Sequence, residues 1–261
     1  MLASPGLDRT RTTLDASAEP AGQPIVRRRG GVAALQLPAQ IYHLAEAANW
    51  PSIQKHGLLS TSALLDWAAL PKNERDRYEQ QQRPEHTELP SGVQIRDQKP
   101  MPTQALERCL VGLTPADWCR LINSKVFFWL DPDRLNRQRA ACESRPQIVL
   151  VVDTERLLSR HADRIALSPI NSGNARRKPA ARGRNTFVSY AEWSESGWSS
   201  ETNGLTAGRR AMSHRPVELT VETAVRDIME CVVGVKRLRP GELFRPNRVL
   251  PFDRGRDVTF L

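Results

Sequence analysis

Two apolar segments constrain the fold of this chain more than any other feature. VFFWL (residues 126–130) and QIVLVVD (147–153) are apolar at nearly every successive position. A strand formed by either segment would therefore present apolar side chains to both faces of its sheet. Such strands must be covered on both sides, so the sequence predicts a sheet with these two segments near its centre.

The remaining pattern places helices early and strands late. After a short strand at IYHL, NWPSIQKHG predicts a helix with Asn49 as N-cap, Pro51 in its first turn and Gly57 as its left-handed end. STSALLDWAAL predicts a second helix. Further strands are expected at IALS (165–168), TFVSY (186–190), VELTV (217–221) and CVVGVKRL (231–238). No repeat and no βαβ regularity is present, which favours an α+β fold over a doubly wound one.

The 261 residues suffice for one large domain or two small ones. Residues 1–38 are rich in Ala, Pro, Gly, Thr and Arg without a hydrophobic period, so we expect a disordered leader there. The folded domain is expected over 39–240, and a basic C-terminal tail over 241–261.

Composition excludes several classes of protein. No run approaches the ~20 apolar residues of a membrane helix, and the N-terminus lacks the basic and apolar regions of a secretory signal. The four cysteines are scattered without a CxxC pair, which argues against a zinc site or a disulfide framework. We expect no metal, no membrane contact and a cytoplasmic protein with reduced thiols.

The net charge of +9 is concentrated in two segments. Residues 171–185 contain five basic and no acidic side chains, and residues 236–257 contain seven basic side chains against three acidic ones. The rest of the chain is neutral. Such a distribution is either an electrostatic footprint for a polyanion or a set of solvated, arginine-rich loops.

Sequence motifs for common active sites are missing. Neither phosphate-binding glycine pattern occurs, and HExxH and GxSxG are absent. The remaining candidates are separated polar residues: His43 in a strand, Arg96 in IRDQKP, and Glu218 in VELTV on the side of the pleat away from its two neighbours. Each also fits an ordinary role, as a core histidine, a surface ion pair or a solvent-facing strand residue.

Five blocks, in order, resemble DarT-type ADP-ribosyltransferases. IYHLAEAANWPSIQKHGLLS resembles the family's opening Tyr-His strand, short helix and Gly-Leu turn. QIRDQKP resembles the segment with the catalytic arginine, VFFWLDPDRL the aromatic strand with its proline-containing turn, and QIVLVVD the next strand. VELTVETAVRDIMECVVGV resembles the late block, in which a glutamate opens a Leu-x-Val strand. The resemblance covers residues 41–238. RDQKP and SPINSG also resemble a functionally uncharacterised bacterial family, whereas 168–184 has no DarT-type counterpart.

The resemblance implies an ADP-ribosyltransferase-like fold of split, mixed β-sheets with flanking helices. It implies an NAD-dependent enzyme of the glycosyltransferase class, with NAD as substrate and with Glu218 and Arg96 as catalytic residues. The residues implied to bind NAD are Tyr42, His43, Gly57, Leu58, Phe127 and Phe128. Because side chains alternate along a strand, only one of the two phenylalanines can face the site. A glutamate among apolar strand residues is expected to have a raised pKa, which suits proton transfer.

The resemblance also implies a nucleic-acid acceptor, because DarT-type enzymes modify bases of single-stranded DNA. The residues expected to bind it are Arg176, Arg177, Lys178, Arg182 and Arg184. Phe187, Tyr190 and Trp193 follow this basic segment. Charge followed by aromatic rings suits a phosphate backbone and stacked bases. The alternative is a loop before a strand whose aromatic side chains face the core.

Three functions remain open. The first is an ADP-ribosyltransferase acting on single-stranded DNA or RNA, as a toxin or phage-defence effector with an antitoxin or hydrolase partner. The second is an RNA 2′-phosphotransferase, which shares the NAD-binding architecture and needs more than one arginine around the RNA phosphate; Arg182 and Arg184 are candidates. The third is a non-catalytic nucleic-acid-binding module on the same fold.

Overall fold

The computed structural model describes residues 36–142, 145–176, 179–201, 210–211, 213–248 and 252. All of them belong to one compact unit, Leu35–Leu261. Most of the expected leader (1–38) and much of the expected tail (241–261) lie outside the described residues. None of the helices in the described segments is long and apolar enough to cross a membrane.

The elements follow the expected order, with most helices before the last strands. The strands are β1 (Gln40–Glu46), β2 (Leu58–Leu59), β3 (Thr87–Glu88), β4 (Gln94–Ile95), β5 (Lys125–Trp129), β6 (Gln147–Asp153), β7 (Ile165–Ser168), β8 (Val188–Ser189), β9 (Glu218–Glu222), β10 (Ala224–Val225) and β11 (Val232–Leu238). The α-helices are α1 (Trp50–His56), α2 (Thr61–Trp67), α3 (Lys72–Gln80), α4 (Thr103–Glu107), α5 (Pro115–Asn123), α6 (Pro132–Ala141), α7 (Thr154–His161), α8 (Tyr190–Ser196) and α10 (Ile228–Cys231).

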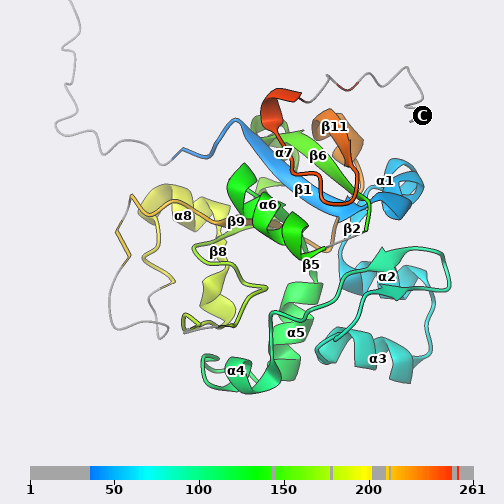
Figure 1. The fold of residues 1–261 in the computed structure, drawn as a ribbon. Coiled ribbons are helices and arrows are strands. Elements are labelled where there is room, and N and C mark those ends of the chain that lie inside the picture. The colour runs from blue at the N-terminus through cyan, green and yellow to red at the C-terminus, as the bar shows by residue number, and fades with distance from the viewer. Residues whose placement is uncertain are drawn as a thin grey trace, which may run out of the picture. The chain divides into compact units, whose positions relative to one another are not determined.

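Seven strands form one sheet in the order β11-β6-β1-β5-β9-β7-β8 (Figure 1). The two apolar segments became β5 and β6, and each lies between two other strands, as predicted. The α+β class with flanking helices is confirmed. The expected mixed sheets differ from the structure, because every described strand pair of this sheet is antiparallel.

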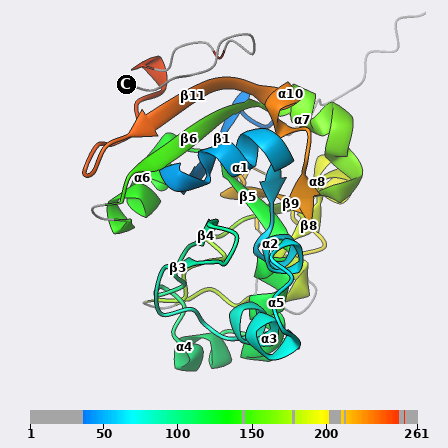
Figure 2. The ribbon, with the colours of Figure 1, turned by 90° about the vertical axis from the view of Figure 1, so that its right-hand side faces the viewer.

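Both faces of the sheet are covered, which explains why its central strands are apolar on both sides. One face packs against α1, α7, α8 and α10 through Ile53, Leu157, Trp193 and Ile228. The other packs against α6 through Leu135. Helices α2, α3, α4 and α5 lie together beyond one end of β5 (Figure 2), where the smaller apolar clusters are found.

The central strands β1 and β5 meet at one place and then diverge. Their pairing has a single register, Tyr42 opposite Trp129, whereas β1 pairs with β6 along all seven of its residues. On its other side β5 pairs with β9 along its whole length. The inner edges of β1 and β5 therefore face a gap in the middle of the sheet. Edge backbone groups are free to bind other molecules.

Two helices lie where the sequence was interpreted otherwise. Helix α6 occupies the segment expected as a turn; its N-cap Asp131 accepts a hydrogen bond from the Asp133 amide, and Pro132 stands at its start. Helix α8 begins at Tyr190, the last residue of the expected strand TFVSY, with the Ser189 side chain as its cap. Both starts have ordinary capping chemistry, so local signals for these helices were present in the sequence.

Candidate active site

A cavity of about 600 Å³ opens where β1 and β5 diverge. It is lined by consecutive residues of both strands, 43–46 of β1 and 125–127 of β5. Because side chains alternate between the faces of a strand, consecutive lining residues mean that strand edges border the cavity. Its size is within the usual range of about 300–1,000 Å³ for small-molecule sites.

The cavity brings together residues that are far apart in the sequence. Six of the eight residues expected to be catalytic or to bind NAD line it: His43, Gly57, Leu58, Arg96, Phe127 and Glu218. They come from β1, β2, β5, β9 and the segments beside them. The remaining two, Tyr42 and Phe128, do not line it.

Glu218 is a buried carboxylate in the cavity wall. It begins β9, opposite Trp129 on one side and Ser168 on the other, and only 3% of its surface is exposed. The Ser172 amide donates to both of its carboxylate oxygens, at 3.3 and 3.2 Å. Burial raises the pKa of Glu218 to about 7, although the hydrogen bonds from Ser172 and the nearby Arg182 and Arg134 act in the opposite direction. The side chain can therefore gain or lose a proton near neutral pH.

His43 lies at the point where β1 and β5 separate. Its Nδ1 is 2.8 Å from the Phe127 carbonyl oxygen. Because that oxygen can only accept, Nδ1 must carry the hydrogen. Burial lowers the pKa of His43 to about 4, so the ring is neutral at pH 7 and its Nε2 is an acceptor. The site thus contains a histidine whose Nε2 can accept a hydrogen bond from a hydroxyl group.

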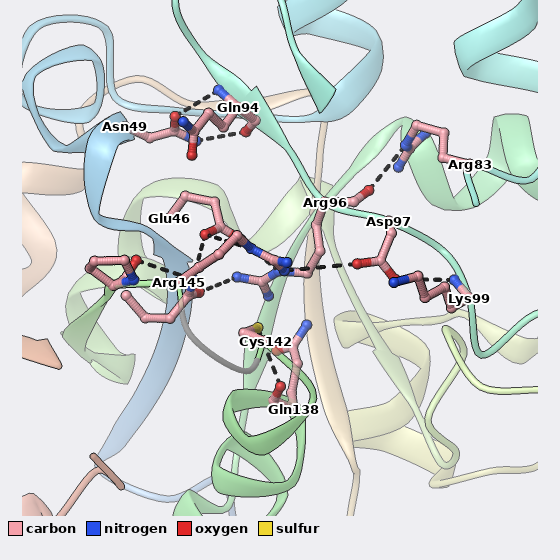
Figure 3. A network of polar contacts seen from close by, with 12 residues as sticks. Glu46, Asn49, Arg83, Gln94, Arg96, Asp97, Lys99, Gln138, Cys142 and Arg145 are labelled. Carbon is pink, nitrogen blue, oxygen red and sulfur yellow. Dashed lines mark hydrogen bonds and ion pairs between the residues drawn. The ribbon is translucent and has the colours of Figure 1, made fainter. Parts of the chain in front are cut away.

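Arg96 belongs to a network of polar side chains (Figure 3). Its Nη2 donates to the Gln147 side-chain oxygen at 2.6 Å, and its Nε lies 3.3 Å from Glu46 Oε1. Arg145 binds the other oxygen of Glu46 at 3.4 Å and lies 3.8 Å from Asp97. Gln147 also donates to Glu46. The network fixes two guanidinium groups in the cavity wall, so Arg96 is in place to contact an anionic ligand.

Gly57 lines the cavity and also has a structural role. Its φ of 77° requires glycine, but a Cβ atom there would collide with the backbone of Val225 and Arg226. Gly57 therefore permits close approach of the chain's own β10, which pairs with β2 at Leu58 and Val225.

Strand alternation explains the other two departures. Tyr42 precedes His43 and points to the face covered by α6, where its ring packs 5.2 Å from that of Phe244. Phe128 is buried in the core of the opposite face, so Phe127 is the phenylalanine that lines the cavity. Only one of the two rings faces the site, as expected.

The basic segment does not form one surface in the described residues. Arg177 and Lys178 lie outside them, whereas Arg176 and Arg184 are exposed. Arg182 is buried, and its guanidinium donates to the carbonyl oxygens of Ser172 at 3.0 Å and Ala180 at 3.1 Å. Arg182 thus supports the segment that contacts Glu218, and a buried guanidinium cannot follow a nucleic-acid backbone.

The aromatic residues after this segment are also structural. Trp193 is buried in the main core, and Tyr190 packs against that core. Phe187 lies against Trp118 and Phe127, with ring centroids 5.9 and 6.3 Å apart. These rings face the interior, as the alternative interpretation held, and they do not offer a stacking surface for bases.

Sequence reasoning missed one wall of the cavity, which is contributed by α6. Arg134, Arg137, Gln138 and Ala141 line the cavity. Their spacing of three, four and seven residues places them on one face of a helix. The Asp-Pro cap and this spacing are the signals that could have identified them.

A second missed wall comes from the SPINSG block. Residues 171–174 line the cavity, and the Ser172 amide binds Glu218. Backbone contacts of this kind cannot be recognised from the pattern of side chains in the sequence.

In the described parts of the chain, no three His, Cys, Asp or Glu side chains lie close enough together to hold a metal ion. The four cysteines are all buried and unpaired.

Comparison with known proteins assigns the chain to a family but gives no activity for it. No curated protein and no solved structure matches the chain. A family whose description is "Family of unknown function (DUF7002)" matches residues 39–232, which contain every residue of the candidate site. The chain therefore belongs to this family.

Proposed function

We propose that this protein is an NAD-dependent ADP-ribosyltransferase. The observation that carries the proposal is Glu218, a buried carboxylate with a pKa of about 7 that shares one cavity with the neutral His43 and with Phe127. Buried ionisable groups with shifted pKa values are concentrated at functional sites. These three residues are among those that the resemblance to DarT-type enzymes implies.

The charges around the cavity suit an anionic dinucleotide. Its charged lining consists of six basic and three acidic side chains: Arg83, Arg96, Lys125, Arg134, Arg137, Arg145, Glu46, Asp97 and Glu218. The diphosphate of NAD would complement this excess of positive charge. Phe127 offers a ring against which nicotinamide can stack, and Nε2 of His43 can accept a hydrogen bond from a ribose hydroxyl.

Ionised Glu218 would act on the charge that develops during transfer. As the bond between the nicotinamide nitrogen and the ribose C1′ breaks, its electron pair leaves with neutral nicotinamide and positive charge develops on the ribose. A carboxylate beside the ribose stabilises that charge and orients a ribose hydroxyl. The acceptor's nucleophilic atom forms the new bond to C1′, and its proton passes to Glu218.

We propose a single-stranded nucleic acid as the acceptor. The exposed Arg176 and Arg184 follow the segment that touches Glu218, so basic side chains lie close in sequence to the reacting centre. Backbone phosphates are recognised by such residues. The buried Arg182 and the core-packed aromatic rings take no part in this interaction.

The RNA 2′-phosphotransferase is the second candidate, and one observation favours it. That chemistry needs several arginines around an RNA phosphate, and Arg134 and Arg137 line the cavity beside each other on α6. They replace Arg182 and Arg184 as the candidates for this role. Removal of a 2′-phosphate from RNA in the presence of NAD would distinguish this enzyme from a base-modifying transferase.

The test uses NAD labelled in its adenylate portion and separate pools of single-stranded DNA, RNA and protein. We expect wild-type protein to transfer label to nucleic acid and Glu218→Gln to lose at least about 100-fold in rate, a usual cost of removing an electrostatic catalytic group. Glu155→Gln is the matched control, because Glu155 is exposed on α7 and away from the cavity.

Each outcome has a definite meaning. Label on protein alone would support an ADP-ribosyltransferase activity but would contradict a nucleic acid as its acceptor. Salt-sensitive nucleic-acid binding with no loss of NAD, equal in wild type and Glu218→Gln, would replace the proposal with the non-catalytic binding module.

A further inference from the structure

Arg83 is a buried cation in the wall of the cavity. It follows α3, only 7% of its surface is exposed, and it lines the cavity. Its hydrogen-bond acceptors are all uncharged: the Arg96 carbonyl at 3.1 Å, the Tyr78 carbonyl at 2.8 Å and the Asn123 side-chain oxygen at 3.2 Å. Burial lowers the pKa of Arg83 to about 10, so it remains charged at neutral pH.

The two carboxylates of the polar network, Glu46 and Asp97, are already engaged by other arginines. Among the described residues, no carboxylate oxygen lies within 4.0 Å of its guanidinium. Asp97 acts on it from a greater distance, but Asp97 is paired with Arg145, and Glu46 is shared by Arg96 and Arg145. The polar network of Figure 3 thus contains three arginines and two carboxylates, all of which line the cavity.

A buried charge without an opposite charge is costly, and proteins seldom retain one without a reason. Here the surrounding amides hold the guanidinium in place: Gln98 accepts from the Arg83 amide at 3.1 Å and donates to Asn123 at 3.2 Å. Asn123 is fixed in turn by its bond to the Glu79 carbonyl at 2.9 Å. The charge is therefore held in place before any ligand arrives.

We propose that Arg83, with Gln98 and Asn123, forms a binding subsite for a phosphate group of a nucleotide ligand. The subsite lies near the Lys125 end of β5, because Asn123 is the last residue of the helix that precedes this strand. Glu218 is opposite Trp129, at the other end. At about 3.4 Å per residue, the four residue steps from Lys125 to Trp129 separate the two ends by about 14 Å. The inference deepens the proposed function, on which it rests for the identity of the nucleotide.

The test is a substitution that supplies the missing negative charge. Gln98→Glu keeps the oxygen that accepts from the Arg83 amide and adds a carboxylate near the guanidinium. We expect it to bind ADP at least tenfold more weakly than wild type and to bind adenosine unchanged, although it loses the hydrogen bond that Gln98 donates to Asn123. Wild-type protein should bind ADP at least tenfold more tightly than adenosine. Calorimetric titration of the full chain measures all four affinities.

Gln104→Glu is the matched control, because it makes the same charge change at an exposed position on α4, outside the cavity lining. It should bind ADP like wild type. Equal wild-type affinity for ADP and adenosine would overturn the subsite, as would unchanged ADP binding in Gln98→Glu. If Gln98→Glu does not fold because it loses the hydrogen bond to Asn123, the wild-type comparison of ADP with adenosine decides the question alone.

The subsite and the proposed function can fail separately. If wild-type protein binds ADP as expected but never consumes NAD, the result supports the phosphate subsite and contradicts the proposed transferase activity. If NAD is consumed and its KM is unchanged in Gln98→Glu, the result supports the transferase activity and contradicts the phosphate subsite.

Discussion

At the scale of single residues, the candidate site depends on two side chains whose charge is altered by burial. His43 is neutral because it is buried and bound to the Phe127 carbonyl. Glu218 exchanges its proton near pH 7 because burial raises its pKa more than the hydrogen bonds from Ser172 and the nearby arginines lower it. Neither property follows from residue identity alone, since both require burial in the folded chain beside the cavity.

The raised pKa of Glu218 predicts a pH-dependent effect of Glu218→Gln on stability. Protonated Glu218 favours folding, so its contribution is fully present below the unfolded pKa of 4.5 and is lost as pH rises through about 7. Relative to the variant, wild type should lose up to about 3 kcal/mol of unfolding free energy over this range. Urea unfolding of both proteins at the two ends of the range measures the change.

Other titrating groups are common to the two proteins, so they cancel in the difference. The side-chain amide introduced by Glu218→Gln still has an oxygen that can accept from the Ser172 amide. The substitution therefore removes the ionisable charge and preserves this hydrogen bond. A difference between wild type and variant that does not change with pH would show that Glu218 titrates normally.

At the scale of elements, the local signals in the sequence predicted the seven strands of the main sheet and the helices α1 and α2. Capping signals also mark other helices: Thr114, with Pro115 at the helix start, forms a complete capping box on α5, and Asp153 caps α7. Helix α6 has an equally ordinary cap but was missed, because its residues were interpreted as a turn after the aromatic strand. The starts of these three helices can therefore be recognised in the sequence from their capping residues.

Gly57 provides a test at this scale. Gly57→Ala should lose about 3 kcal/mol of stability, because a positive φ costs about 1 kcal/mol and the collision of its Cβ with β10 adds about 2 kcal/mol. Gly92→Ala is the matched control: its φ is 78°, but a Cβ there meets nothing within 4 Å. It should lose only about 1 kcal/mol.

Chemical denaturation of the two variants and wild type measures this comparison. Equal losses in the two variants would show that β10 does not press against Gly57. The pairing of β2 with β10 would then depend on contacts other than this close approach.

At the scale of the whole molecule, the decisive feature is the divergence of β1 and β5. The sequence predicted both strands, their burial and the α+β class, because these follow from local periodicity. It did not predict that the strands separate beyond the Tyr42–Trp129 pair, over residues 43–46 of β1 and 125–128 of β5, because pairing depends on distant segments. The same limit explains why Arg182 was interpreted as a surface residue and why Ser172, Arg134 and Arg83 were not recognised in the site.

The most direct test of the proposed function is the release of nicotinamide from NAD as a function of pH. Because ionised Glu218 is the active form, the rate constant kcat/KM of wild type should rise from about pH 5.5 to about pH 8.5 with one ionisation near 7. Glu218→Gln should show no such rise and almost no release. Release that is equal in the two proteins across this range would contradict the assignment of Glu218, and the absence of any release would contradict the transferase itself.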